Sequence, residues 1–255
     1  MPRNQFLMKQ KNQSDLSLKP CGHFNLARFT FGRAVTFFAL SITILGSCGK
    51  ETLDIPAPSF NYFPTDKGRF VIFDVDSIVH ATNDNQNDDS VYYYSYQVKE
   101  IIDSSFVDGE GNVRQVIVRY FRNDTTQDWT INSVWTQSLS STSAYRWEEN
   151  IPYHKLSFPI NVEIEWNGND KNTLDQVLLQ YEDIHEQQTI NNLSFDSTVI
   201  VTDNAVPNAV EDISNIEIYA AAVGMIYKEN INLRKTSGQV VSGIEFTMTV
   251  SSYGR

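Results

Sequence analysis

Ile244-Glu-Phe-Thr-Met-Thr-Val-Ser251, near the C-terminus, is the stretch that decides the fold class. Apolar and polar side chains alternate along it, which is the pattern of a β-strand with one face on a core and the other toward solvent. The stretch Val71-Ile-Phe-Asp-Val-Asp76 shows the same period of two. Both stretches therefore predict half-buried strands.

Further strands are expected between these two. The run from Val91 to Ile102 is rich in β-branched and aromatic residues, and Asp108-Gly-Glu-Gly-Asn112 is typical of a hairpin turn that leads into a return strand from Val113 to Phe121. Val162, Ile164 and Trp166 alternate with Glu163 and Glu165. Strands joined by short polar turns predict an all-β fold, either an antiparallel β-sandwich or a curved half-barrel.

One segment leaves the secondary structure open. Leu174, Val177, Leu178 and Tyr181 have the spacing of a short helix within residues 174–186. The residues after Tyr181 fit a strand nearly as well, so both alternatives remain.

The N-terminal region has the pattern of a secretory signal. Six of the first 33 residues are basic and one is acidic, and an uncharged, mostly apolar run extends from Ala34 to Leu45. A membrane-spanning helix needs about 20 residues, so this run is too short to be one. A buried core helix is the alternative, but nothing amphipathic surrounds the run.

Leu45-Gly46-Ser47-Cys48 resembles a bacterial lipobox. The resemblance implies cleavage before Cys48, where small residues let the peptidase reach the bond, and a lipid on the cysteine thiol. Residues 1–47 are then a signal peptide that is removed, residues 48–68 the lipidated cysteine and a flexible tether, and residues 69–255 a single β domain. The expected location is the cell envelope, with membrane lipid held through Cys48 at the outer membrane, on its periplasmic or its outer surface.

Removal of the signal changes the charge and the cysteine content. Residues 48–255 keep 14 of the 20 basic and 30 of the 31 acidic residues, so the formal net charge becomes −16 instead of −11. Phosphate binding needs clusters of Lys and Arg, so a nucleic-acid partner is not expected. Cys21 leaves with the signal and Cys48 alone remains, which excludes an intramolecular disulfide, a redox pair and a cysteine-rich zinc site.

Two patterns invite comparison with metal sites. Residues 82–90 are rich in Asn and Asp, as calcium loops are, but an EF-hand that starts at Asn83 would need Gly and Glu where Asp88 and Tyr94 stand. A solvated turn is the favoured interpretation. His80, His154 and His185 form no zinc-binding spacing. No metal or other cofactor is predicted.

No catalytic residue is predicted either. The chain has no G-x-S-x-G elbow, and Ser237-Gly238 and Ser242-Gly243 are expected to be turn residues. Glu163 and Glu165 share one strand face and could flank a sugar as the two carboxylates of a glycosidase do, but such pairs arise by chance in an acidic chain.

Aromatic residues could form a binding surface. Tyr92-Tyr93-Tyr94 and the four tryptophans could stack on carbohydrate or line an apolar cavity; the tryptophans are Trp129, Trp135, Trp147 and Trp166. Consecutive tyrosines on a strand must point to both faces. Core and cross-strand packing is therefore the favoured role.

Several strings resemble an uncharacterised family of lipoproteins from Bacteroidota. They include Asn61-Tyr-Phe-Pro-Thr-Asp-Lys-Gly68, Leu156-Ser-Phe-Pro159, Glu165-Trp-Asn-Gly-Asn169, Leu193-Ser-Phe-Asp-Ser-Thr-Val199, Val223-Gly-Met-Ile-Tyr-Lys-Glu229 and Phe246-Thr-Met-Thr-Val-Ser-Ser-Tyr-Gly254. The resemblance implies class and location and supplies no catalytic residues. It also implies O-glycan acceptors at Asp-Ser/Thr triplets, here Ser77, Thr125 and Ser197.

The sequence therefore predicts a membrane-anchored envelope lipoprotein whose non-enzymatic β domain binds or helps to assemble envelope components. One alternative is a carrier of an apolar or lipid ligand, which needs a continuous apolar pocket of several hundred Å³. The other is a carbohydrate-binding surface lipoprotein, which needs exposed aromatic rings. The partner, an envelope protein or a ligand, is not specified by the sequence.

Overall fold

The computed structural model describes residues 60–81, 90–205 and 208–255. The predicted signal peptide, Cys48, the first part of the predicted tether and most of the Asn/Asp loop lie outside these residues. Among the described residues, no helix is both long enough and apolar enough to cross a membrane.

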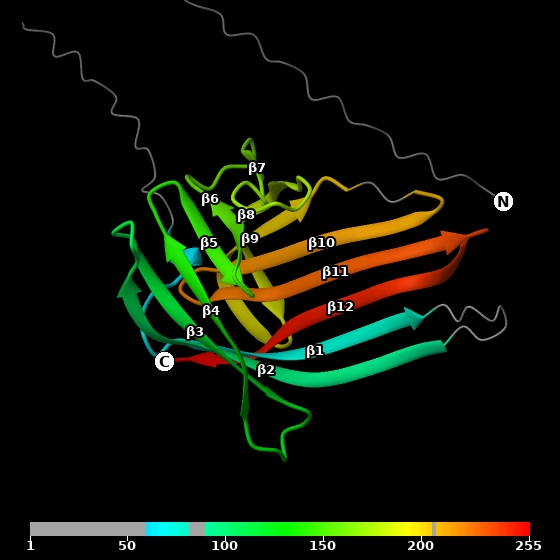
Figure 1. The fold of residues 1–255 in the computed structure, drawn as a ribbon, viewed down its shortest axis with the longest axis horizontal. Helices are drawn as coiled ribbons and strands as arrows, with labels where there is room; N and C mark the ends of the chain where they lie inside the picture. Colours follow the sequence, from blue (N-terminus) through cyan, green and yellow to red (C-terminus); the bar gives the residue numbers. More distant parts are fainter. Residues whose placement is uncertain (1–59, 82–89, 206–207) are drawn as a thin grey trace, which may run out of the picture. The chain divides into compact units, whose positions relative to one another are not determined.

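The described residues form one antiparallel sheet of twelve strands after a short 3₁₀ turn, η1 (Phe60–Tyr62) (Figure 1). The strands are β1 (Phe70–Ala81), β2 (Ser90–Val107), β3 (Val113–Arg122), β4 (Thr130–Leu139), β5 (Ser143–Glu148), β6 (Ile151–Ser157), β7 (Glu165–Asn167), β8 (Leu178–Ile190), β9 (Leu193–Asp203), β10 (Glu211–Ala220), β11 (Gly224–Thr236) and β12 (Gln239–Gly254).

The sheet runs up and down in a nearly closed ring. Its strand order is β6-β5-β4-β3-β2-β1-β12-β11-β10-β9-β8-β7, so every neighbour is also a neighbour in sequence except β1 and β12. The two end strands meet where the His154 amide donates to the Gly168 carbonyl at 2.9 Å and the Trp166 indole N–H donates to the His154 carbonyl at 3.0 Å. The predicted all-β class is confirmed, and of the two predicted architectures the single curved sheet is the one observed.

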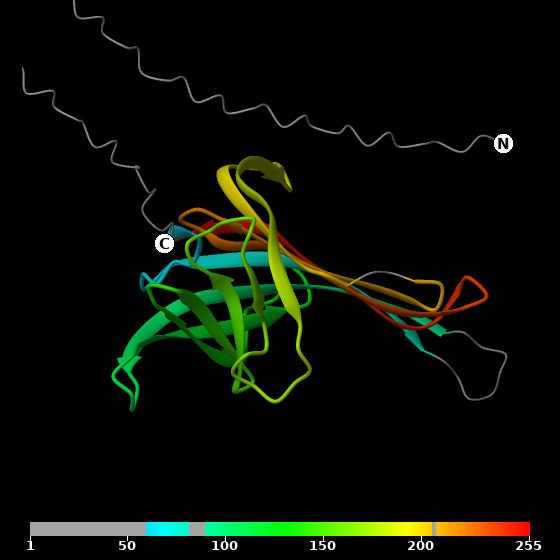
Figure 2. The same ribbon diagram turned by 90° about the horizontal axis from the view of Figure 1, so that it is seen from above.

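The middle strands of the sheet continue beyond the curved part as a flat extension (Figure 2). We call this part the extension; it consists of residues 77–81, 90–96, 211–215, 230–236 and 239–246. In the extension β2 is not paired with β3, because the β2–β3 pairing begins only at Gln97 of β2. Likewise β10 is not paired with β9, because the β10–β9 pairing begins only at Ile216 of β10. Among the described strands, the extension therefore has two unpaired edges.

The core fills the inner, concave face of the curved part. Phe73, Val75 and Val98 are buried there with Met248. Tyr62 and Phe63 are also in this cluster, with exposed fractions of 0% and 2%. The Pro64 carbonyl accepts a hydrogen bond of 2.8 Å from Gln137. Residues 60–68, which the sequence assigned to the tether, thus close one end of the curved sheet.

The short helix considered for residues 174–186 is wrong, and its strand alternative is right. Leu178 to Ile190 is strand β8. Its pairing with β9 shifts register at three places, and His185 has a φ of 61°. The helix-like spacing had combined Leu174 and Val177, which precede the strand, with the first residues of β8. After Tyr181 each shift moves the side chains from one face toward the other, so no period of two follows there either.

Two other local predictions need correction. The strand expected from Val162 to Trp166 is reduced to β7, because Asn161 forms a turn in which its side chain accepts from the Glu163 amide at 3.0 Å. Ser242 and Gly243 lie inside β12 instead of in a turn. The β11–β12 turn consists of Ser237 and Gly238, as expected.

Candidate functional site

A row of side chains across the inner face of the sheet places opposite charges next to each other. Glu217 on β10 pairs in register with Lys228 on β11, Lys228 with Met248 on β12, and Met248 with Val75 on β1. Because residues directly opposite one another share a face, Glu217 and Lys228 point to the same side as the buried Val75 and Met248. The Lys228 Nζ lies 3.4 Å from Glu217 Oε1.

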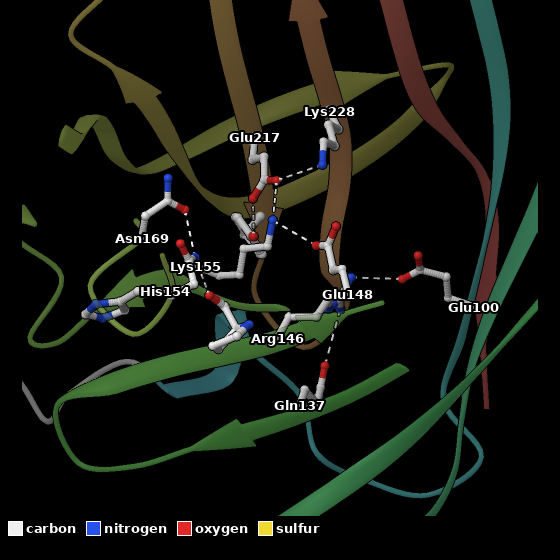
Figure 3. Close-up of polar contacts among 12 residues, drawn as sticks. Glu100, Gln137, Arg146, Glu148, His154, Lys155, Asn169, Glu217 and Lys228 are labelled. Atoms are coloured by element: carbon white, nitrogen blue, oxygen red, sulfur yellow. Dashed lines mark hydrogen bonds and ion pairs between the residues drawn. The ribbon is translucent and has the colours of Figure 1, made fainter. Parts of the chain in front are cut away.

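Lys155 connects this row to the other half of the ring. Its Nζ lies 2.8 Å from Glu217 Oε1 and 3.0 Å from Glu148 Oε1, so one ammonium lies between two carboxylates (Figure 3). The Tyr219 hydroxyl donates to the second oxygen of Glu217 at 2.5 Å. Lys155 comes from the irregular point of β6, where the register with β5 shifts between Ala144 and Tyr145. We call Glu148, Lys155, Glu217 and Lys228 the charged quartet.

A second charged group lies deeper in the ring. Glu100 on β2 accepts from the Arg119 Nε and from the Arg146 Nη1, both at 3.0 Å. Arg146 also donates to the Gln137 side chain at 3.3 Å (Figure 3). The Arg119 guanidinium lies 3.7 Å from the centroid of the Trp135 ring. Each charge in this group has a partner, as buried charges require.

The environment keeps Glu148, Glu217 and Lys155 ionised. Burial acts to raise the pKa of Glu148, but the ammonium groups of Lys155 and Lys228 outweigh it and lower that pKa to about 2. Burial likewise opposes the ionised form of Glu217, and the same two lysines lower its pKa below the ordinary value. For Lys155, burial favours the neutral amine, whereas Glu148 and Glu217 raise the pKa above its usual range.

These shifts decide what the site can do. A general acid or base works best with a pKa near the ambient pH, whereas both carboxyl pKa values move down and the Lys155 pKa moves up. The quartet therefore presents fixed charges and hydrogen-bonding groups at neutral pH. Such an arrangement is suited to holding a ligand.

The quartet borders a cleft of about 280 Å³. Amide side chains from Asn169, Asn215 and Asn230 also line it, as do Tyr153, His154 and the apolar side chains of Val177, Leu179 and Val201. The Asn230 amide donates to Asn215, and the Asn215 amide donates to Asp203, which forms a polar chain beside the charges.

One more acid borders the same cleft without adding to its charge. Glu229 is next to Lys228 in sequence, so its side chain lies on the opposite face of β11. There its carboxylate accepts from the Tyr227 hydroxyl at 3.0 Å and from the Ser214 hydroxyl at 3.2 Å. The charges directed into the cleft by the quartet therefore balance.

The three histidines that the sequence analysis considered as metal ligands lie apart, and each has its own partners. His80 pairs with Glu245 at 2.8 Å, and His185 is hydrogen-bonded to the Tyr62 hydroxyl at 2.7 Å. His154 is stacked on Tyr145 and has its pKa lowered by burial. The described residues contain no group of three or more His, Cys, Asp or Glu placed to hold a metal ion.

The tryptophans pack against arginines or within the core. Trp166 is buried, whereas the other three lie under guanidinium groups of β3. The ring centroid to guanidinium carbon distances are 3.9 Å for Trp147 with Arg114, 3.7 Å for Trp135 with Arg119 and 4.2 Å for Trp129 with Arg122. For the tryptophans the packing role favoured from the sequence thus agrees with the structure. For Tyr92, Tyr93 and Tyr94 it is wrong as a core role, because these side chains are exposed.

The remaining candidates are scattered. Glu163 lies in the turn before β7 and Glu165 at its exposed start, so the two carboxylates do not share a strand. Ser77 is 8% exposed and faces the interior, and Ser197 is hydrogen-bonded to Tyr62 at 2.6 Å. Of the three acceptor positions considered for O-glycans, Thr125 is the exposed one, in the loop between β3 and β4. Leu45, Gly46, Ser47 and Cys48 lie outside the described residues.

Comparisons with known proteins give limited information. No family model matches the chain, and no curated protein matches it. One solved structure is similar to it, a protein from Parabacteroides distasonis described as a candidate lipoprotein. The two have 10% identity and a TM-score of 0.37, and the match covers 76% of this chain and 98% of that one. A likeness at this level does not indicate a function.

Proposed function

We propose that this chain is a lipid-anchored envelope lipoprotein whose β domain binds an uncharged, hydroxyl-rich ligand, a saccharide unit, in the cleft beside the charged quartet. The observation that carries this proposal is the internal charge balance of the cleft. Lys155 and Lys228 are already paired with Glu148 and Glu217 at 2.8 to 3.4 Å. A charged ligand would have to displace one of these partners, whereas hydroxyl groups can bond to the free lone pairs and N–H groups.

The size and lining of the cleft support the same class of ligand. A volume of about 280 Å³ is close to the lower end of the range for small-molecule sites, about 300–1,000 Å³, and is compatible with one or two sugar rings. Leu179 and Val201 offer apolar surface to the carbon face of a sugar, and Asn215 and Asn230 offer amide donors and acceptors. Saccharide binding was an alternative from the sequence, where it was expected to use exposed tryptophan or tyrosine rings. The cleft supports it through amide, charged and apolar side chains instead, with none of the tryptophans in its lining.

The apolar-carrier alternative has less support. It requires a continuous apolar pocket of several hundred Å³. One cavity on the inner face is lined by the charged quartet, and another, near Phe63 and Met225, has a volume of only about 40 Å³. The side chains of Tyr62 and Phe63 occupy space on the inner face that a lipid tail would need.

A glycan array probed with the full chain tests the proposal. We expect binding to neutral saccharides, with an affinity that changes little between low and high salt because no ion pair forms with the ligand. An Asn230→Ala variant should weaken this binding about five- to tenfold, the worth of one lost hydrogen bond. Asn123→Ala, which removes an exposed loop amide outside the cleft, is the matched control and should bind as the parent does.

A blank array would overturn the proposal. Binding that is confined to anionic glycans and falls steeply with salt would also contradict it, because the ligand would then be recognised by charge. Equal losses in Asn230→Ala and Asn123→Ala would place the binding outside the cleft.

A further inference from the structure

The outer edge of β2 within the extension has no described strand beside it. β3 pairs with β2 only from Gln97 onward, so residues 90–96 pair with β1 on one side and with none of the twelve strands on the other (Figure 1). An unpaired strand edge presents a row of free backbone N–H and C=O groups that can template another strand.

The hydrogen-bond pattern shows which groups point outward. The Ile102 amide donates to the Arg69 carbonyl at 2.9 Å and the Ile102 carbonyl accepts from Gly68 at 2.7 Å, so Ile102 is directed toward β1. The β1–β2 register has no shift from residue 101 back to residue 90. In an antiparallel pair, alternate residues point their backbone groups to the same neighbour. Val91, Tyr93 and Ser95 therefore direct theirs to the unpaired side.

The side chains of this edge lack the features that usually protect one. Ser90-Val-Tyr-Tyr-Tyr-Ser-Tyr96 contains no charged residue and no proline. Tyr92, Tyr93 and Tyr94 are 49%, 75% and 53% exposed. The other unpaired edge of the extension offers a comparison within the same molecule, since β10 begins with Glu211 and Asp212, and Asp212 pairs with Lys235 at 2.8 Å. The β10 edge is charged, and the β2 edge is not.

The three tyrosines at the centre of the β2 edge are symmetric about Tyr93. Tyr92 corresponds to Tyr94, and the next positions outward are Val91 and Ser95, both uncharged. An antiparallel pair centred on Tyr93 would place outward-directed residues opposite outward-directed residues, as ladder hydrogen bonds require. It would also place tyrosine opposite tyrosine on both faces, which favours pairing. Because residues 90–96 carry no charge, the paired segments themselves would not repel each other.

From these observations we infer that two copies of this chain pair through their β2 edges, with the two-fold axis at Tyr93. The interface is isologous, as in most homodimers, and it joins the two sheets into one continuous sheet. This inference does not depend on what the cleft binds, because the β2 edge and the charged quartet share no residue.

Cysteine cross-linking in the full chain tests the pairing. Tyr93→Cys places two thiols across the two-fold axis, where paired Cα atoms lie about 5.5 Å apart, within the range of a disulfide. We expect a covalent dimer on a non-reducing gel after mild oxidation. The parent chain, with Cys21 and Cys48 unchanged, gives the background, and Ser214→Cys on the β10 edge is the matched control, which should not exceed that background.

The register has its own test. When Val91→Cys and Ser95→Cys chains carrying different tags are co-expressed, the mixed dimer should form in preference to either homodimer. Absence of a Tyr93→Cys dimer above background, or equal cross-linking from Ser214→Cys, would overturn the inference.

A charge on the edge supplies the complementary measurement. Tyr93→Lys places two ammonium groups at the two-fold axis and should shift the full chain in detergent from dimer to monomer mass in sedimentation velocity. Ser214→Lys should leave the dimer intact. If the parent chain is monomeric, or if Tyr93→Lys stays dimeric, the β2 edge is not the interface.

Discussion

Lys155 illustrates at the scale of a single residue how this fold keeps charge in its interior. A buried ammonium without a partner is costly, and here two carboxylates lie within 3.0 Å of it. Glu217 has further partners in Lys228 and in the Tyr219 hydroxyl. Removal of the central cation would leave both acids without their nearest counter-charge.

Replacement of Lys155 by methionine is therefore expected to destabilise the domain by about 3–5 kcal/mol at pH 7. The pKa values of Glu148 and Glu217 are lower in the folded than in the unfolded chain, so the stability that they supply is present above about pH 4.3 and is lost as the pH falls toward the folded values. The difference in the free energy of unfolding between the parent and Lys155→Met should become smaller as the pH falls from about 5 to about 2.5. Urea unfolding of the full chain measures it.

Lys235→Met is the control for this measurement. Lys235 forms a more exposed pair with Asp212, which should contribute about 0–1 kcal/mol. If Lys155→Met and Lys235→Met lower the free energy of unfolding by similar amounts, the Lys155 pairs do not stabilise the fold. The same conclusion follows if the difference between the parent and Lys155→Met stays constant at low pH.

The quartet could not be predicted from the sequence, and Glu217 shows why. Ile216 and Ile218 alternate with Glu217 and Tyr219, so the period of two predicts a strand with the isoleucines inside. The alternation does correspond to a strand, but the face with Glu217 and Tyr219 is the inner one, and Ile218 packs against a second hydrophobic cluster. The inward direction of Lys155 could not be predicted for another reason. The register shift between β5 and β6 interrupts the alternation of inward and outward side chains at this residue.

At the scale of the element, the strands were predictable where the pairing is regular and were missed where it shifts. β1 and the β2–β3 hairpin follow the sequence closely, and Asp108 closes that turn by accepting from the Glu110 and Asn112 amides at 3.0 and 2.9 Å. β8 has three register shifts and was ambiguous. A bulge places consecutive residues on one face, and a single sequence gives no sign of which residue is the extra one.

Gly243 lies two residues from one such bulge, which the register shift between β11 and β12 places at Val241, and substitution of Gly243 is expected to be costly. It lies in β12 with a φ of 134°, and a Cβ there would approach the Asn232 carbonyl oxygen closely enough to clash. Gly243→Ala should lower the free energy of unfolding by at least about 1–3 kcal/mol. Gly109→Ala, at a turn position with nothing within 4 Å of the added methyl, should change it little. Equal thermal unfolding midpoints for the two variants would contradict this account of β12.

For the molecule as a whole, the sequence predicted the all-β class but not how the sheet closes into a ring. Strands and short turns suffice to predict antiparallel neighbours. The β1–β12 pairing that joins the two halves, and the meeting of β6 and β7, depend on contacts between residues far apart in the chain. Such contacts leave no local pattern, which is why sandwich and half-barrel could not be distinguished.

The proposed anchor is tested on the intact chain in a bacterial envelope. Cys48→Ala should abolish incorporation of labelled palmitate and release the protein from the membrane fraction, because the thiol is the attachment point of the lipid. Cys21→Ala is the control and should retain both properties, since Cys21 lies in the segment that the signal interpretation removes. Persistence of Cys48→Ala in the membrane fraction would contradict the anchor.

The burial of Tyr62 and Phe63 at one end of the curved sheet has a mechanical consequence for a protein with the proposed anchor. Force from the membrane would enter the domain at Phe60, and the first side chains to bear it are those two aromatics, with the Tyr62 hydroxyl held by His185 and Ser197. A pull would therefore load the contacts of Tyr62 and Phe63 before it loads β1, which follows them in the chain. Loss of these contacts would expose part of the core to water.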